Sequence, residues 1–259
     1  MTIYTTRLLY AGESSDTYGG LKCTIESNNS DSNDEQTSLK ISKIPYKKRF
    51  DYHYLDYSDP LIFKLTIANK DGTYIDANKE RMLKKWLCKE NRNWLNFDQI
   101  DAADKYFYCV IHNPRKISAG NLTIAIEFDV ECDAGFAWSK LYQRTYTTSS
   151  GTLNFKFFNT VDFDGYLLSP IFIITPLVNG TIKIKNNTTG DEMIINNCVT
   201  TEVITMDNET ERFNSNNGRV LLDDWNKVVI DFLEGINDIT LTGNFSLQLE
   251  YRLPMRIGG

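Results

Sequence analysis

The stretch Asn121-Leu-Thr-Ile-Ala-Ile-Glu-Phe-Asp-Val-Glu-Cys132 alternates between larger apolar residues and residues that are polar or, at Ala125, small. A period of two is typical of a long β-strand that turns one face to a hydrophobic core. The apolar face runs from Leu122 to Cys132. The stretch therefore predicts that the first half of the chain is built on a β-sheet. The opposite face of the strand carries three carboxylates, those of Glu127, Asp129 and Glu131.

Strand signals dominate the rest of the chain as well. The clearest is Phe245 to Tyr251, where apolar residues again alternate with polar ones. The segment Lys185 to Gly190 has the composition of a hairpin turn between two strands. Because no long helix separates the late strands, we expect them to pair antiparallel. Shorter strands are predicted at Lys105 to Ile111, Leu153 to Phe158, Ile171 to Thr175, Thr181 to Lys185, Met193 to Ile195 and Val199 to Met206.

One α-helix is predicted near residues 76–88, with Asp76 as its N-cap. Its polar side holds Glu80 and Lys84 at a spacing of four residues, which favours an exposed ion pair. Its apolar side follows the helical period and is expected to pack on the sheet of the first domain. That apolar side consists of Met82, Leu83, Trp86 and Leu87.

The chain changes in character between Asp133 and Tyr146, directly after the long strand. The residues before this junction contain the helix, whereas those after it consist of strand signals and short turns. We therefore predict a mainly β protein of two domains. Residues 1–140 form a β-sandwich-like domain with one α-helix, and residues 141–259 form a second β-sandwich. Phe136 and Trp138 are the predicted anchors of the crossing between the two domains.

Composition and charge argue against several classes of protein. The 259 residues carry a net charge of −6, whereas proteins that bind nucleic-acid phosphates carry a basic surplus. The five cysteines are scattered without a CxxC pair, which is typical of free reduced thiols. The chain shows no signal-peptide pattern, and its longest apolar tract, Leu167 to Val178, is too short to span a bilayer. We expect synthesis in a cytoplasm and no membrane insertion.

Residues that could carry catalysis are few and poorly spaced. Cys109 and His112 are three apart on a predicted strand, and this odd offset places them on opposite faces. Asp162 and Asp164 could form a carboxylate pair, but in glycosidases the two groups come from separate elements that flank the sugar. The chain contains no nucleotide-binding loop, zinc-protease motif or nucleophile elbow. We predict no catalytic residue and no cofactor.

Two segments have a weak likeness to binding motifs. His112-Asn113-Pro114-Arg115 is similar to the sugar-binding signature of galectins, in which His and Asn are spaced so that both face the sugar. Here they are adjacent, and their side chains are expected to diverge. The acidic segment Glu26 to Glu35 has the Asp and Asn content of a calcium loop but lacks its central Gly and terminal Glu. A surface loop explains it better, and we predict no metal site.

The three carboxylates of the long strand have two interpretations. Like charges two positions apart on one strand face repel one another, so their grouping needs a reason. In the first interpretation this face is simply solvated. In the second, Glu127, Asp129 and Glu131 line a channel through which DNA passes without adhering.

The order of several motifs resembles that of phage distal tail proteins. These proteins begin with an aromatic residue, a Gly, a Ser-Ser-Asp stretch, a second aromatic residue and a Gly, as in Tyr10-Ala-Gly-Glu-Ser-Ser-Asp-Thr-Tyr-Gly19. The helix ending in Lys85-Trp-Leu87 and the segment Trp94 to Asp98 follow in the same order. The strand that begins at Lys105 comes next.

The end of the long strand and the C-terminal half continue the resemblance. Phe128-Asp-Val-Glu-Cys-Asp-Ala-Gly-Phe-Ala-Trp138 is similar to the close of the family's first domain, although Ala134 and Gly135 stand where a Pro is usual. Gly235-Ile-Asn237 and the final strand to Arg252 resemble its galectin-like second domain. The resemblance covers the whole chain and implies the short form, without an inserted carbohydrate-binding module.

Membership of this family would imply a structural role in the distal part of a virion tail. The implied assembly is a homo-oligomeric ring, a hexamer, built in the cytoplasm of the bacterial host. One side of the ring would meet the tail tube protein, and the other the tail-tip or baseplate hub protein and a receptor-binding protein. DNA would pass through the lumen without specific binding.

The sequence leaves three alternatives open. The first is a carbohydrate-binding module of a host-adhesion device, which rests on the sandwich-like second half. The second is an enzyme, and the third is a tube protein that stacks many rings. A carbohydrate-binding module would need exposed aromatic side chains in a groove.

Overall fold

The computed structural model of the protein describes residues 3–27, 38–43, 50–56, 59–99, 102–149 and 151–257. The chain forms two compact units: Met1–Ser139 with Pro254–Gly259, and Lys140–Leu253. The first crossing thus lies next to the predicted boundary at 140. The end of the chain differs from the prediction, because it belongs to the first unit. Most of the acidic segment Glu26 to Glu35 lies outside the described residues.

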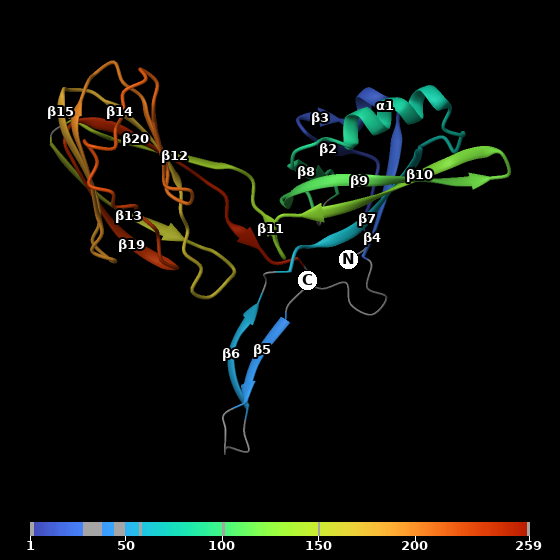
Figure 1. The fold of residues 1–259 in the computed structure, drawn as a ribbon, viewed down its shortest axis with the longest axis horizontal. Helices are drawn as coiled ribbons and strands as arrows, with labels where there is room; N and C mark the ends of the chain where they lie inside the picture. Colours follow the sequence, from blue (N-terminus) through green and yellow to red (C-terminus); the bar gives the residue numbers. More distant parts are fainter. Residues whose placement is uncertain are drawn as a thin grey trace. The chain divides into compact units, whose positions relative to one another are not determined.

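The first unit is built on one antiparallel sheet, to which the chain returns at its C-terminal end (Figure 1). In spatial order its strands are β1 (Ile3–Thr5), β4 (Leu21–Ser27), β7 (Ile62–Asn69), β10 (Leu122–Cys132), β9 (Tyr106–Ala119), β8 (Asn93–Phe97), β2 (Leu8–Tyr10) and β3 (Glu13–Ser14). Two short strands join the sheet beside β9, namely β11 (Ala137–Trp138) and β21 (Pro254–Met255). A separate two-stranded sheet pairs β5 (Ser38–Lys43) with β6 (Phe50–Asp56).

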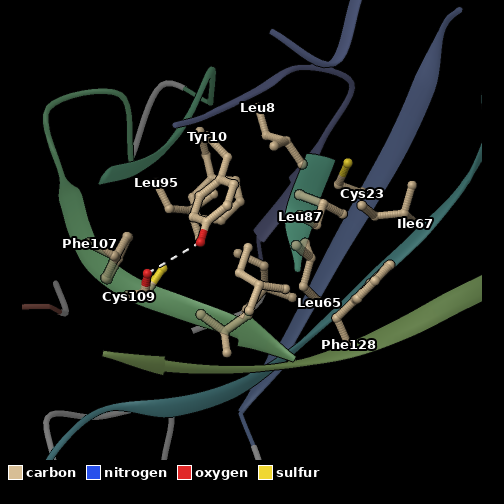
Figure 2. Close-up of a cluster of buried hydrophobic side chains, with 14 of the residues drawn as sticks. Leu8, Tyr10, Cys23, Leu65, Ile67, Leu87, Leu95, Phe107, Cys109 and Phe128 are labelled. Atoms are coloured by element: carbon tan, nitrogen blue, oxygen red, sulfur yellow. Dashed lines mark hydrogen bonds between the residues drawn. The ribbon is translucent and has the colours of Figure 1, made fainter. Parts of the chain in front are cut away.

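The sheet curls around its own core. Leu8 and Tyr10 from β2 are fully buried in the same cluster as Cys23 from β4 and Ile67 from β7, although these strands are far apart in the order of the sheet. Figure 2 shows the Tyr10 ring inside this cluster, with its hydroxyl donating a hydrogen bond to the carbonyl oxygen of Cys109 at 3.4 Å. Burial raises the pKa of Tyr10 to about 12. The curl gives the predicted sandwich-like domain its two facing layers.

The predicted helix is α1 (Ala77–Leu87), which lies against β9 and the short 3-10 helix η1 (Ser15–Tyr18) (Figure 1). Asp76 caps it as predicted, accepting a hydrogen bond from the Lys79 amide at 2.7 Å. Leu83, Trp86 and Leu87 are buried, but Met82 is 44% exposed. Met82 therefore lies outside the buried stripe, because each residue turns a helix by about 100° and Met82 falls on the flank of Leu83.

Glu80, which was predicted on the polar side, joins Leu83, Trp86 and Leu87 in the buried stripe. The residue is only 9% exposed, and its two carboxylate oxygens each contact a lysine ammonium at 2.7 Å, from Lys84 on α1 and Lys116 on β9. The predicted Glu80–Lys84 pair exists, but it is half of a bridge that ties the helix to β9. The hydrogen bonds from Lys116 and Lys84 lower the pKa of Glu80.

We expect Glu80→Gln to lower the unfolding free energy of the first unit by about 1 kcal/mol at pH 7. Because the folded-state pKa lies below the ordinary value of 4.5, the carboxylate stabilises the fold above that value. The stabilisation is lost as the pH falls through the folded-state pKa. Urea unfolding at pH 7, 5 and 3 measures this loss, with exposed Glu90→Gln as the control. A deficit of equal size at pH 3 would contradict the ionic bridge.

The second unit is a β-sandwich of two antiparallel sheets (Figure 1). The first sheet has the order β12 (Tyr142–Thr148), β20 (Phe245–Tyr251), β14 (Ile171–Pro176), β17 (Ile204–Asp207) and β18 (Arg212–Ser215). The second has the order β13 (Thr152–Asn159), β19 (Gly235–Thr242), β15 (Gly180–Asn186) and β16 (Glu192–Cys198). Alternate residues of both sheets meet in one buried cluster, as sheet-on-sheet packing requires.

The predicted fold class is confirmed: the protein is mainly β, with one α-helix among the described residues and sandwich packing. The one strand placed wrongly is Val199 to Met206. Its first part is a turn, closed by a hydrogen bond from the Glu202 amide to the Val199 carbonyl at 3.0 Å, and β17 begins at Ile204. Within the described ranges, no helix has the length and hydropathy needed to cross a membrane.

Candidate functional site

The polar side of β10 forms the centre of a charged face on the first unit. We define this charged face as Lys64 on β7, His112, Asn113 and Arg115 on β9, and Glu127, Asp129 and Glu131 on β10. The core lies on the other side of β10, where the side chains of Ile126, Phe128 and Val130 point inward with no exposure. Alternation along β10 thus places the three carboxylates away from the core, as the sequence predicts.

Each carboxylate of the charged face meets a basic or amide group on a neighbouring strand. Glu127 Oε1 lies 3.3 Å from Lys64 Nζ and 3.0 Å from Arg115 Nε. The Arg115 guanidinium also donates to Asp129, which accepts a second hydrogen bond from Asn113 Nδ2 at 3.1 Å. Farther along, His112 Nε2 lies 3.9 Å from Glu131 Oε2. Two permanent cations therefore face three carboxylates.

A β-bulge brings these partners onto one face. The register passes from the Asp129–His112 pair to the Glu127–Arg115 pair, so β9 uses one residue more than β10 between them. Asn113 absorbs the irregularity with a left-handed φ of 49°. Strict alternation would have separated His112 from Arg115. The Asn-Pro pair inside a strand was the available signal, because Pro within a sheet occurs at edges or bulges.

The pairing changes the chemical character of the face. The side chains of Glu127 and Asp129 are 20% and 19% exposed, and only Glu131, at 43%, reaches further into solvent. Ion pairs at the protein surface contribute about 0.2–1 kcal/mol each, so the face adds little to stability. It is a nearly neutral, hydrogen-bonded surface and not a bare acidic strip. Its position on a lumen stays a prediction.

The hairpin between β9 and β10 continues past the sheet. Pairing with β7 ends at Ala125, while β9 and β10 remain paired to Ala119 and Leu122. We define residues 117–124 as the hairpin tip, because β7 no longer pairs with β10 there, and the hairpin projects beyond the neighbouring strands in Figure 1. Its large apolar side chains are exposed: Ile117 by 38%, Leu122 by 52% and Ile124 by 42%.

The prediction that Leu122 and Ile124 belong to the core face is therefore wrong, because both side chains are exposed. A second register shift, between Thr123 and Ala125, interrupts the alternation, and β7 does not extend to cover this end of β10. The helix connection touches the tip through the Ile75 amide, which donates to the Thr123 carbonyl at 2.7 Å.

The aromatic pair at the junction lies within the first unit. The rings of Phe136 and Trp138 meet edge to face with centroids 5.0 Å apart. Trp138 Nε1 donates to Asp133 Oδ1 at 3.3 Å, and partial burial raises the pKa of Asp133. Trp138 also pairs with Tyr106 and Pro254 in the sheet. The role of Phe136 and Trp138 as anchors between domains stays a prediction.

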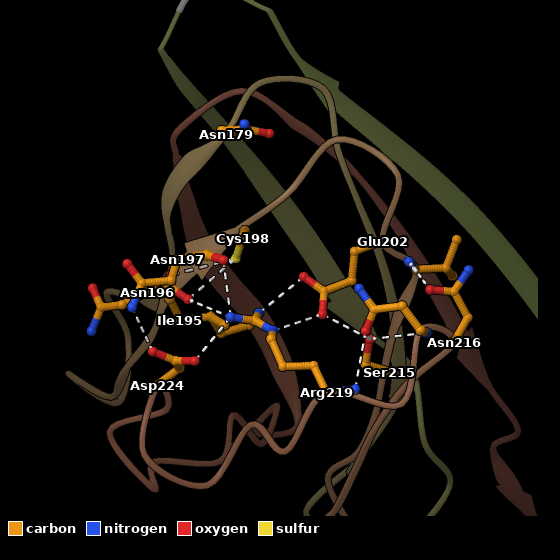
Figure 3. A network of polar contacts seen from close by, with 12 residues as sticks. Asn179, Ile195, Asn196, Asn197, Cys198, Glu202, Ser215, Asn216, Arg219 and Asp224 are labelled. Atoms are coloured by element: carbon orange, nitrogen blue, oxygen red, sulfur yellow. Dashed lines mark hydrogen bonds and ion pairs between the residues drawn. The ribbon is translucent and has the colours of Figure 1, made fainter.

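The second unit contains a polar network that no sequence motif predicted. Arg219 holds Glu202 through two nitrogens, at 3.0 and 2.9 Å, and Asp224 through a third at 2.9 Å (Figure 3). Glu202 has no exposed side-chain area, and Ser215 Oγ also donates to it at 2.7 Å. With every charged group paired, we interpret this network as a clamp for the loop 216–224.

The remaining candidates do not assemble into a reactive site. Asp162 and Asp164 are both exposed in the loop between β13 and β14. Cys109 is buried while His112 is partly exposed, so they lie on opposite sides of β9 as predicted. In the described part of the chain, no group of three or more His, Cys, Asp or Glu side chains is arranged to hold a metal ion.

Two family models match the chain almost end to end. The phage tail protein N-terminal domain matches residues 3–134, and the phage tail C-terminal domain matches residues 136–251. The chain belongs to this family of phage tail proteins. The two matches meet at the same junction at which the chain passes from the first unit to the second. None of the curated proteins compared with this phage tail protein matches it.

Among solved structures, the phage tail protein is similar to the Dit (gp 19.1) protein of phage SPP1. The TM-score is 0.67 at 9% sequence identity, with 97% of this chain and 99% of that chain covered. The SPP1 protein is described as a paradigm of the hub adsorption apparatus in phages that infect Gram-positive bacteria. At this identity the likeness establishes a shared fold, and it confirms the resemblance to distal tail proteins at that level.

Proposed function

We propose that this phage tail protein forms a closed homo-oligomeric ring, a hexamer, at the distal end of the virion tail. The ring connects the tail tube protein to the tail-tip or baseplate hub protein and leaves a channel for DNA. Assembly takes place in the cytoplasm of the bacterial host. The role is structural rather than enzymatic. The family of tail proteins and the fold shared with SPP1 Dit support this proposal.

The hairpin tip is the observation that carries the ring. A two-stranded ribbon without a third strand or a packed face is marginally stable in water, and this one exposes three large apolar side chains. Such a ribbon becomes stable when a second copy of the chain covers it. A contact between different patches of identical subunits generates a ring when the rotation closes.

The charged face supports the channel. A lumen of fixed cations would hold DNA phosphates, and a bare acidic lumen would repel them and its own subunits. Here Arg115 and Lys64 already pair with Glu127 and Asp129, so few free charges remain to bind a passing backbone. Glu131 adds a mild negative charge. This combination suits transit without adhesion.

The ring can be tested by native mass spectrometry and mass photometry of the purified full chain. We expect a discrete hexamer, and we expect Leu122→Asp with Ile124→Asp to reduce it to monomer, because a charge in an apolar contact weakens each interface by about 2 kcal/mol or more. The matched control is Leu222→Asp, which alters an equally exposed leucine of the second unit. A strict monomer at high concentration would contradict the ring.

A hexamer that survives the double substitution would leave the ring in place and reject the hairpin tip as its contact. The circular dichroism spectrum of the variant should be unchanged, because both side chains are already solvent-exposed.

A further inference from the structure

Two of the five cysteines face each other across neighbouring strands. Cys109 on β9 and Cys132 on β10 are direct register partners. Both are free thiols, and both point into the core with no exposure. The neighbouring Cys109 side chain, together with burial, raises the pKa of Cys132 well above its ordinary value.

Hydrogen bonds on either side identify the type of cross-strand pair. The Asp133 amide donates to the Tyr108 carbonyl at 2.9 Å, so the adjacent positions 109 and 132 form a non-hydrogen-bonded pair. The Cys132 amide instead donates to the Leu61 carbonyl at 2.9 Å, and the Cys109 carbonyl accepts from the Tyr10 hydroxyl at 3.4 Å (Figure 2). Both backbones thus direct their polar groups away from each other.

This type of pair has the spacing that a disulfide requires. Opposed Cα atoms at non-hydrogen-bonded positions lie about 4.5 Å apart and bring their side chains closest together. Disulfides span Cα separations of about 4.4–6.8 Å. The other buried cysteines lack such a partner: Cys23 is opposite Thr5 and Ile67, and Cys198 is opposite Gly180.

We propose that Cys109 and Cys132 are a latent cross-strand disulfide, reduced during synthesis and oxidised once the protein is in an oxidising medium. The oxidant is a small-molecule disulfide. Each cysteine thiol gives up its proton, one sulfur–sulfur bond forms between β9 and β10, and the two electrons and two protons convert the oxidant into two thiols.

The position of the bond suits it to stabilise the pairing of β9 with β10. It would join β9 to β10 behind the charged face, on the two strands that also form the hairpin tip. A covalent link between these strands restricts the unfolded chain and keeps their register in place. Burial and protonation make the thiols slow to react, which favours survival of the reduced form through folding.

The test uses the full chain with Cys88→Ser, because Cys88 is the exposed thiol and would form mixed disulfides. The folded protein is incubated with oxidised glutathione, then denatured and alkylated. We expect two alkylated thiols instead of four, a mass loss of two hydrogens, and a linked peptide pair containing Cys109 and Cys132. The melting temperature should rise by roughly 5–10 °C relative to the reduced form.

Two further variants keep the outcome decisive. Cys132→Ala in the same background should retain all three thiols under oxidant, whereas Cys198→Ala should still form the bond. Four labelled thiols after prolonged oxidation, a bond between other cysteines, or a lowered melting temperature in the oxidised protein would each overturn the proposal.

Discussion

Replacing Arg219 by alanine is expected to lower the unfolding free energy of the second unit by about 3–5 kcal/mol, because it would leave a buried carboxylate without its cation. Glu202 has no exposed side-chain area and receives two of the guanidinium nitrogens. The same change also frees Asp224 and the carbonyl of Asn197, which accepts from Arg219 at 2.9 Å.

The measurement must separate the two units, since they need not unfold together. Trp225 is the one tryptophan of the second unit, so fluorine-labelled tryptophan followed by NMR through a denaturant titration reports each unit separately. Only the Trp225 signal should shift its midpoint. Exposed Arg212→Ala serves as the control and should change stability by no more than about 0.5 kcal/mol.

A double variant tests the physical cause. Adding Glu202→Gln to Arg219→Ala removes the unpaired charge and should recover part of the lost stability, although the amide stays buried. If the double variant is as unstable as Arg219→Ala alone, the loss comes from packing of the loop and not from the stranded carboxylate.

The second large effect is expected in the first unit, where Trp86→Ala should cost about 3–5 kcal/mol. Trp86 is 1% exposed, stacks on Tyr18 with centroids 4.4 Å apart, and donates from Nε1 to the Tyr10 carbonyl at 3.1 Å. The substitution removes a large buried ring together with its hydrogen bond to that carbonyl. We expect α1 to lose its packing against η1 and β9 as a result.

Met82→Ala on the same helix is the matched control, because its side chain is 44% exposed. We expect a change within about 0.5 kcal/mol. Trp86→Phe should fall between the two, since it keeps most of the apolar contact but lacks the indole donor. Denaturant unfolding of the three variants measures this order. Equal losses of unfolding free energy for Met82→Ala and Trp86→Ala would contradict the exposed position of Met82.

The sequence predicted those features that depend on local periodicity. The alternation of β10 and β20 gave two strands almost to the residue, and Asp76 marked the start of the helix. In each case one short segment contains the whole signal, so neighbours in space add little to it.

What the sequence could not predict depends on residues far apart in the chain. Arg219 meets Glu202 only because two turns converge, and Glu80 is buried only because Lys116 arrives from another strand. Helix periodicity alone cannot show that the carboxylate of Glu80 is buried by its lysine partners while the apolar side chain of Met82 is exposed. The bulge at Asn113 breaks the strict period of two on which the strand prediction relies. This bulge brings His112 and Arg115 onto the charged face.

The return of the chain to β21 has a mechanical consequence. Trp138, where the chain leaves the first unit, pairs with Pro254, where it comes back. The second unit is thus an insertion whose two connections to the first unit, the end of β11 and the start of β21, are adjacent and antiparallel. A force that pulls on the second unit is therefore shared by both connections in the same direction and does not slide β11 past β21. Any foreign module whose ends lie equally close could be spliced in at the same two points.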